Sequence, residues 1–176
     1  MRKWVALLRG VNVGGANKVP MPALRALASG LGWQGVRSHI ASGNLVFAAE
    51  GTAAGLAEDL RQAMAAQMGV DVAVLVLSGA DLRGALSDCP FDPPEGKQVH
   101  GFFLFAAPVL DPAALEQWRA PREELVVRGR VGWLYAPDGI GRSKLAERLH
   151  KVITGTDMTA RNLNTLRALV ALLAAE

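Results

Sequence analysis

One order of strands and helices is predicted twice along the 176 residues, and this repeat constrains the fold more than any other feature. In the first half, short apolar runs alternate with segments of helical periodicity in the order βαββαβ. The second half repeats βαββα and adds a further helix. The order β-α-β-β-α-β is that of a ferredoxin-like unit. The sequence therefore predicts an α+β fold of two ferredoxin-like βαββα(β) subdomains, with mainly antiparallel sheets and packed helices.

Proline and glycine signals place the limits of the two subdomains. The segment Asp92-Pro-Pro-Glu-Gly96 is the clearest linker in the chain. We expect the first subdomain over residues 1–78 and a connecting helix and linker over 79–96. The second subdomain is expected over 97–176, with a helical C-terminus in place of its last strand.

Local signals also predict individual elements. Strands are expected at 4–8, 36–40, 45–47, 70–77 and 99–105, with a hairpin around 128–130. Helix starts are expected at Pro22, Thr52, Asp111, Ser143 and close to Thr159. The apolar phase of these elements predicts a core containing Leu7, Leu27, Phe47, Leu60, Val74, Phe103 and Leu134.

Composition narrows the possible partners. No apolar run approaches the roughly 18 residues of a membrane span, so we expect no membrane partner. The net charge of +3 is too small to indicate nucleic-acid binding by itself. Cys89 is the single cysteine and cannot form an internal disulfide. The apolar stretch after Met1 is too short for a signal peptide, which favours the cytoplasm.

Polar residues are expected to converge where two predicted strands meet. In a ferredoxin-like unit the end of the first strand lies beside the start of the third, which brings the loop 9–15 next to 42–44. The candidate ligand-binding residues are Arg9, Asn12, Gly14, Gly15, Ser42 and Asn44. Arginine, amides and glycine backbone beside a helix start suit a phosphate or carboxylate. The alternative is that these residues only form turns and brace loops.

Three segments also carry a family resemblance: Leu7-Leu-Arg-Gly-Val-Asn-Val-Gly-Gly15, Ser42-Gly-Asn-Leu-Val-Phe47 and Thr159-Ala-Arg-Asn-Leu-Asn-Thr165. In this order they resemble the signatures of the bacterial family known as domain of unknown function 1697. Leu163 stands where that family usually has tryptophan, and Cys89 where it has asparagine. The resemblance implies a duplicated α+β fold and does not indicate any particular activity. It adds Arg161 and Asn162, expected on the last helix, to the candidate ligand-binding residues.

Several chemistries find no support in the sequence. His39, His100 and His150 are scattered, so we expect no metal site, and no cofactor motif is present. The basic segment 139–144 is a second anion candidate, although Ser143 also fits as a helix cap. The leading hypothesis is a non-catalytic binding protein for a phosphorylated small molecule, a nucleotide or an RNA end. The alternatives are an enzyme that stabilises an anionic transition state through arginine, asparagine and serine, or a ligand-free interaction module; catalytic residues and oligomeric state are not predicted.

Overall fold

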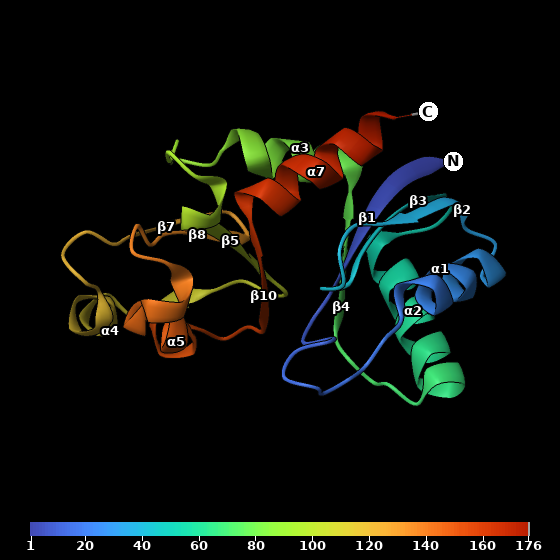
Figure 1. The fold of residues 1–176 in the computed structure, drawn as a ribbon, viewed down its shortest axis with the longest axis horizontal. Coiled ribbons are helices and arrows are strands. Elements are labelled where there is room, and N and C mark those ends of the chain that lie inside the picture. Colours follow the sequence, from blue (N-terminus) through green and yellow to red (C-terminus); the bar gives the residue numbers. More distant parts are fainter. Residues whose placement is uncertain (176) are drawn as a thin grey trace. The chain divides into compact units, whose positions relative to one another are not determined.

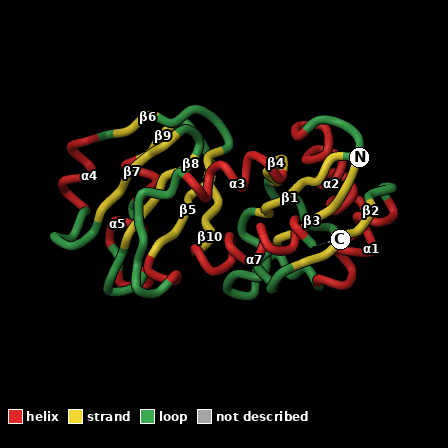
Figure 2. The backbone as a smooth tube through the Cα atoms, turned by 90° about the horizontal axis from the view of Figure 1, so that it is seen from above, coloured by secondary structure: helices red, strands yellow, loops and turns green. Residues whose placement is uncertain are grey.

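The computed structural model describes residues 1–175 and divides the chain into two compact units. Unit 1 contains residues 1–84 together with the described residues from 167 on, and unit 2 contains residues 85–166. Each unit has one four-stranded antiparallel sheet with helices packed against it (Figures 1 and 2). These sheets and helices confirm the predicted α+β class. The chain passes between the units within two helices, α3 (Gly79–Ser87) and α7 (Leu163–Ala174).

Unit 1 follows the predicted order of elements. They are β1 (Arg2–Leu8), α1 (Met21–Gly30), β2 (Gln34–Ser38), β3 (Asn44–Ala49), α2 (Ala53–Met68) and β4 (Val74–Ser78). The strands lie in the order β2-β3-β1-β4, so β1 is paired on both sides. The predicted strand over 70–77 is displaced, because residues 70–73 lie outside the ladder and only 74–78 pair with β1.

Helices α1 and α2 cover one face of this sheet. Strand alternation turns Trp4, Ala6 and Leu8 toward the helices, where they form one buried cluster with residues of α1, α2 and β3. Phe47 stacks on Trp33 within this cluster, with 3.9 Å between the ring centroids. The first core of the protein therefore lies between the sheet and these two helices.

The end of α7 also belongs to unit 1, and two cations hold it there. Lys3 Nζ donates to the carbonyl of Leu173 at 2.9 Å, and Arg37 Nη2 donates to the carbonyl of Leu172 at 2.6 Å. The last carbonyls of a helix lack partners inside the helix and carry its negative dipole end. Two strands of the first sheet thus supply the cap for the last helix of the chain, which Figure 1 shows beside the start of β1.

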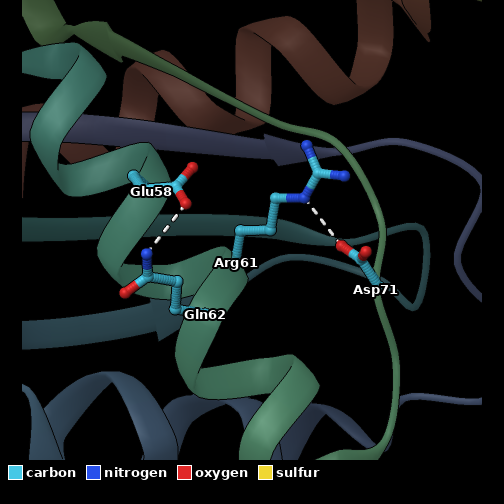
Figure 3. Close-up of polar contacts among 4 residues, drawn as sticks. All are labelled: Glu58, Arg61, Gln62 and Asp71. Atoms are coloured by element: carbon cyan, nitrogen blue, oxygen red, sulfur yellow. Dashed lines mark hydrogen bonds and ion pairs between the residues drawn. The ribbon is translucent and has the colours of Figure 1, made fainter.

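An exposed ion pair ties α2 to the segment that leads into β4. Arg61 Nε donates to Asp71 Oδ1 at 2.7 Å, and the neighbouring Gln62 donates from Nε2 to Glu58 Oε1 along the same helix (Figure 3). The hydrogen bond from Arg61, and then its charge, lower the pKa of Asp71. Because both side chains are exposed, this pair guides the connection more than it stabilises the unit.

Unit 2 contains a second sheet in the order β10-β5-β8-β7 and a two-stranded sheet of β6 and β9. Its strands are β5 (Val99–Leu104), β6 (Val109–Leu110), β7 (Glu124–Arg128), β8 (Val131–Tyr135), β9 (Ile153–Thr154) and β10 (Met158–Asn162). Its helices are α4 (Pro112–Trp118), α5 (Lys144–Glu147) and α6 (Leu149–Val152), with short 3-10 turns at Gly96–Gln98 and Ile140–Arg142. Helices α4 to α6 enclose a second core with Phe102, Leu104 and Leu134.

The C-terminal part of the prediction was wrong at one point. Residues 158–162 form strand β10 and pair with β5, so a last strand is present and α7 begins only at Leu163. Arg161 and Asn162 accordingly lie on a strand instead of a helix. Alternating burial explains the result: Thr159 and Arg161 are buried, while their neighbours are half-buried. The helical spacing of leucines starts only at Leu163, four residues after the helix start expected close to Thr159.

Other local predictions are confirmed. The side chains of Thr52, Asp111 and Ser143 accept hydrogen bonds at the starts of α2, α4 and α5. The structure also shows that Gly69, with a left-handed backbone, ends α2. The seven predicted core residues are all buried, namely Leu7, Leu27, Phe47, Leu60, Val74, Phe103 and Leu134.

Leu60 offers a direct test of the first core. Leu60→Ala removes a fully buried side chain of α2, so unfolding should become easier by about 2–5 kcal/mol. Leu31→Ala, at a leucine that is 37% exposed, should change stability by about 0.5 kcal/mol or less. Chemical denaturation of the two variants measures both values, and equal losses would contradict the described packing.

Candidate functional site

The pairing of β1 with β3 brings two distant loops together. Leu7 lies opposite Asn44 in the ladder, and the N–H of Leu8 donates to the carbonyl of Gly43 at 2.9 Å. The loop after β1 (residues 9–20) therefore runs beside the turn between β2 and β3 (residues 39–43). We call these two segments the rim of unit 1.

Gly43 is the point of closest approach between the two segments. Its φ is +85°, and a Cβ built there would lie 2.7 Å from Val11 Cγ2 and 2.8 Å from Leu8 Cβ. Both distances are far below a normal contact, and the positive φ is itself unfavourable for side chains other than glycine. Glycine at this position is thus required by the contact between loop and turn.

Asn44 holds the turn from inside. Its side chain is fully buried, and Nδ2 donates to the carbonyl of His39 at 3.0 Å and to Ser42 Oγ at 2.8 Å. Buried amides need such partners, because leaving them unsatisfied is costly. Ser42 and Asn44 together therefore fix the turn that faces the loop.

Asn12 holds the loop to the turn. With a φ of +56°, it donates from Nδ2 to the carbonyls of Val19 at 2.9 Å and Ala41 at 2.7 Å, and Oδ1 accepts from the N–H of Val19 at 2.8 Å. These bonds use both the donor and the acceptor side of the amide. Asn12 and Asn44 thus brace the rim, and their suggested role in orienting a ligand stays a prediction.

A pocket of about 450 Å³ opens on the rim. Its lining includes Asn12, Gly15, Lys18, Pro20, Met21 and Ala41. Helix α1 starts here after Pro20, which has no side-chain acceptor, and no side chain caps it among the described residues. The positive end of the helix dipole and exposed Lys18 therefore meet at one pocket.

The remaining predicted rim residues lie on the surface of the same loop. Arg9 is exposed, and its backbone N–H donates to the carbonyl of Ala73 at 3.0 Å. Gly14 and Gly15 are exposed with positive φ, and of the two only Gly15 lines the pocket. The predicted residues of unit 1 thus share one rim but divide into braces and exposed groups.

Arg161 and Asn162 belong to unit 2. Arg161 is buried, and its Nη1 donates to Thr159 Oγ1 at 2.7 Å and to the carbonyl of Ala160 at 2.8 Å. Burial lowers its pKa to about 10, so it still carries a charge at neutral pH. Asn162 is half-buried, and its Oδ1 accepts from the N–H of Thr165 at 2.9 Å, which caps α7.

Asn162 also lines a second pocket, of about 400 Å³. The polar part of this lining contains Glu95, Lys97, Gln98, His100, Asp138 and Asn162, and the apolar part Pro137 and Ile140. Gln98 joins two of its walls: Nε2 donates to the carbonyl of Pro137 at 3.2 Å, and Oε1 accepts from the N–H of Glu95 at 3.1 Å. The walls are therefore held in place by the protein itself.

His100 is the unusual residue of the second pocket. Its Nδ1 is buried and has no hydrogen-bond partner within residues 1–175. Burial lowers the pKa of the imidazole from 6.5 to about 4, so the ring is neutral at pH 7. A buried nitrogen without a hydrogen-bond partner costs free energy in the folded protein.

Sequence reasoning missed both Lys18 and His100. A signal existed for each. Lys18 directly precedes the proline-marked start of α1, and His100 shares the alternation of Phe102 and Leu104, which places it at the end of the core face of β5. Residues 139–144 were the second anion candidate. Within this segment, Ser143 caps α5, as the alternative expectation held.

Comparisons with known proteins give a family and a fold. The model of a family described as protein of unknown function (DUF1697) matches residues 1–133. A solved structure of the conserved bacterial protein SP0830 from Streptococcus pneumoniae is 27% identical, covers 98% of both chains and superposes with a TM-score of 0.76. No curated protein gave a match. Within residues 1–175, no helix combines the length and the apolar character needed to cross a membrane.

The rim should depend strongly on Gly43. Gly43→Ala combines a positive φ with a clash against Val11 and Leu8, so it should cost about 1–3 kcal/mol more than a positive φ alone. Gly69→Ala is the matched control, since its φ is +66° and no atom would lie within 4 Å of the new Cβ. Denaturation curves that show equal losses for the two variants would contradict the close contact.

His100 should make the protein sensitive to acid. The unfolded imidazole binds a proton near pH 6.5 and the folded one only near pH 4, so unfolding takes up protons between these values. Stability should fall by about 2–3 kcal/mol as pH drops across this window. Glu95, Lys97 and Asp138 also line the pocket, so His100→Gln must serve as the reference. Parallel pH curves for the two proteins would exclude the depressed pKa.

Proposed function

We propose that this chain, which belongs to the DUF1697 family of proteins of unknown function, is a non-catalytic binding protein for a small phosphorylated molecule. The observation that carries the proposal is the rim pocket of unit 1. There, exposed Lys18 meets the uncapped N-terminus of α1. Free helix N–H groups and a lysine are a common pairing at phosphate sites.

The charge at this pocket favours an anion over a neutral ligand. Lys18 lines it, while Arg9 is exposed on the same loop, and the lining contains no carboxylate among its described residues. A phosphate at the start of α1 would gain from the helix dipole and from Lys18, while Arg9 adds positive charge to the same loop. Gly15 leaves the backbone open to close approach by a ligand.

The braces of the rim give this pocket a fixed shape. Asn12 joins Val19 and Ala41, which both line the pocket. A site formed in advance loses less conformational entropy when a ligand binds. Asn12 therefore acts as a positioning residue in this proposal, and Lys18 and Arg9 supply the charge.

We also infer that the two units are copies of one ferredoxin-like arrangement. Support comes from the strand orders: β2-β3-β1-β4 in unit 1 corresponds, strand for strand, to β7-β8-β5-β10 in unit 2. The loop after β5 in unit 2 is not a repeat of the glycine-rich loop after β1. The proposed phosphate pocket is therefore a feature of unit 1 that the second copy does not share.

Phosphate dependence tests the proposed function. Adenosine 5′-monophosphate and inorganic phosphate should raise the melting temperature with concentration, whereas adenosine should not. Lys18→Met should fold normally and bind the nucleotide at least tenfold more weakly, since a hydrogen bond to a charged group contributes about 1.5–3 kcal/mol. Arg9→Ala should weaken binding in the same direction.

Lys151→Met is the control, because Lys151 is an exposed lysine of unit 2. It removes the same charge and should leave binding unchanged. Equal effects of Lys18→Met and Lys151→Met would indicate attraction by net charge alone. No response to either phosphate probe would refute the proposal and favour a ligand-free interaction module.

A further inference from the structure

We propose that a third pocket, in unit 1 at the start of β1, binds a compact anion with at least two negative charges. Its volume is about 430 Å³. The pocket lies where β1 begins and where β4 runs into α3, and its described lining comprises Arg2, Lys3, Ser78, Gly79, Ala80 and Arg83. We call it the cation pocket, because three of these side chains are positively charged.

The cation pocket is separate from the rim pocket. Strand β1 spans Arg2–Leu8, and the loop that forms the rim follows the last residue of this strand. The two pockets therefore lie at opposite ends of β1, roughly 20 Å apart, since a strand rises about 3.3 Å per residue. The inference thus goes beyond the proposed phosphate site and uses none of its residues.

The two cations of β1 are each held by a neutral group. The guanidinium carbon of Arg2 lies 5.3 Å from the centre of the Trp4 ring, and a guanidinium stacked on a ring keeps its N–H groups for other acceptors. Lys3 Nζ donates to the carbonyls of Leu173 at 2.9 Å and Ala175 at 3.3 Å, so one of its three N–H groups remains. These contacts orient both side chains without neutralising them.

Arg83 and Ser78 add donors from the side of α3. A Cβ built on Gly79 would lie 3.5 Å from Arg83 Nη1, so the guanidinium folds back over the first turn of its helix. Ser78 Oγ accepts from the N–H of Asp81 at 3.0 Å, which leaves its hydroxyl proton able to donate. A ligand in the pocket can therefore be held by groups from two elements.

The three positive charges have no counter-charge in the described part of the chain. Within residues 1–175, no carboxylate lines the pocket, and none of the three cations forms an ion pair. Like charges that share a pocket repel one another, and a pocket lined by one sign of charge attracts ions of the other sign. Three cations favour an anion of several charges over a single one.

The donor set fits two kinds of anion. Arginine binds the paired oxygens of phosphate and of carboxylate in the same forked geometry. Linked phosphates and compact tricarboxylates therefore share the chemistry that this pocket recognises. Diphosphate and citrate are the probes that distinguish the two sources.

The competing explanation is structural. Arg2 would only cover Trp4, Lys3 would only cap α7, and Arg83 would only be solvated. Under this explanation a polyanion acts as a general salt and has no more effect than chloride at the same ionic strength. Under the ligand explanation it binds saturably and stabilises the folded chain.

The experiment titrates diphosphate and citrate into the full chain, with ionic strength held constant by sodium chloride and amide NMR signals as the readout. At least one probe should shift the signals of residues 2–4 and 78–83 saturably, and the tighter of the two identifies the class of anion. Acetate should bind at least tenfold more weakly. Signals of residues 12–21 report the rim pocket separately, so shifts confined to them would overturn this proposal and leave the phosphate proposal standing.

Arg83→Gln is the decisive variant. Arg83 is exposed on α3 and glutamine is a good helix former, so the fold should persist while affinity at residues 78–83 falls at least tenfold. Arg2→Gln should act in the same direction, whereas Lys3 is left intact because it also caps α7.

Arg130→Gln is the matched control, since Arg130 is an exposed arginine of unit 2 and the variant loses the same charge. It should bind as the parent does. Equal weakening in Arg83→Gln and Arg130→Gln would overturn the proposal, and so would the failure of both diphosphate and citrate to shift the signals of residues 78–83.

Discussion

The antiparallel pairing of β1 with β3 is the constraint on which the proposed phosphate pocket depends. Val5, Ala6 and Leu7 are all fully buried, so both faces of β1 are covered. A slip of one residue would exchange these faces and misplace every side chain. The fixed register sets Leu7 opposite Asn44. This register places the loop after β1 next to the turn before β3.

Polar groups at the rim act mainly on the protein itself. Asn12 and Asn44 bond to backbone carbonyls of neighbouring segments, which replaces the regular hydrogen bonds that loops lack. Such side-chain bonds determine the loop conformation, and exposed Lys18 lines the pocket that the loop forms. The asparagines of the two motifs thus shape the pocket, and they contribute less to direct contact with a ligand.

The features that could be predicted from the sequence are those that depend on a few neighbouring residues. Thr52, Asp111 and Ser143 were recognisable as caps because a side-chain oxygen before a helix has one main use. The rim was predictable because strand pairing follows from topology. The strand at 158–162 was not, since its burial depends on pairing with β5, a partner more than fifty residues earlier. The pockets were not predictable, because the rim pocket needs the left-handed backbone of Asn12. Asparagine adopts this conformation more readily than most residues, but the sequence does not show which asparagine does so.

Lys3 and Arg37, which belong to the first part of the chain, cap the end of α7, which belongs to its last part. Unit 1 therefore contains segments that are synthesised at different times. Residues 1–84 leave the ribosome well before residue 167, with the whole of unit 2 in between. The first sheet can pair early, but the side that receives α7 must wait until the other unit has been made. During synthesis, therefore, the first unit to begin folding is also the last to be completed. A nascent chain that stalls within unit 2 exposes a unit 1 that still lacks its part of α7.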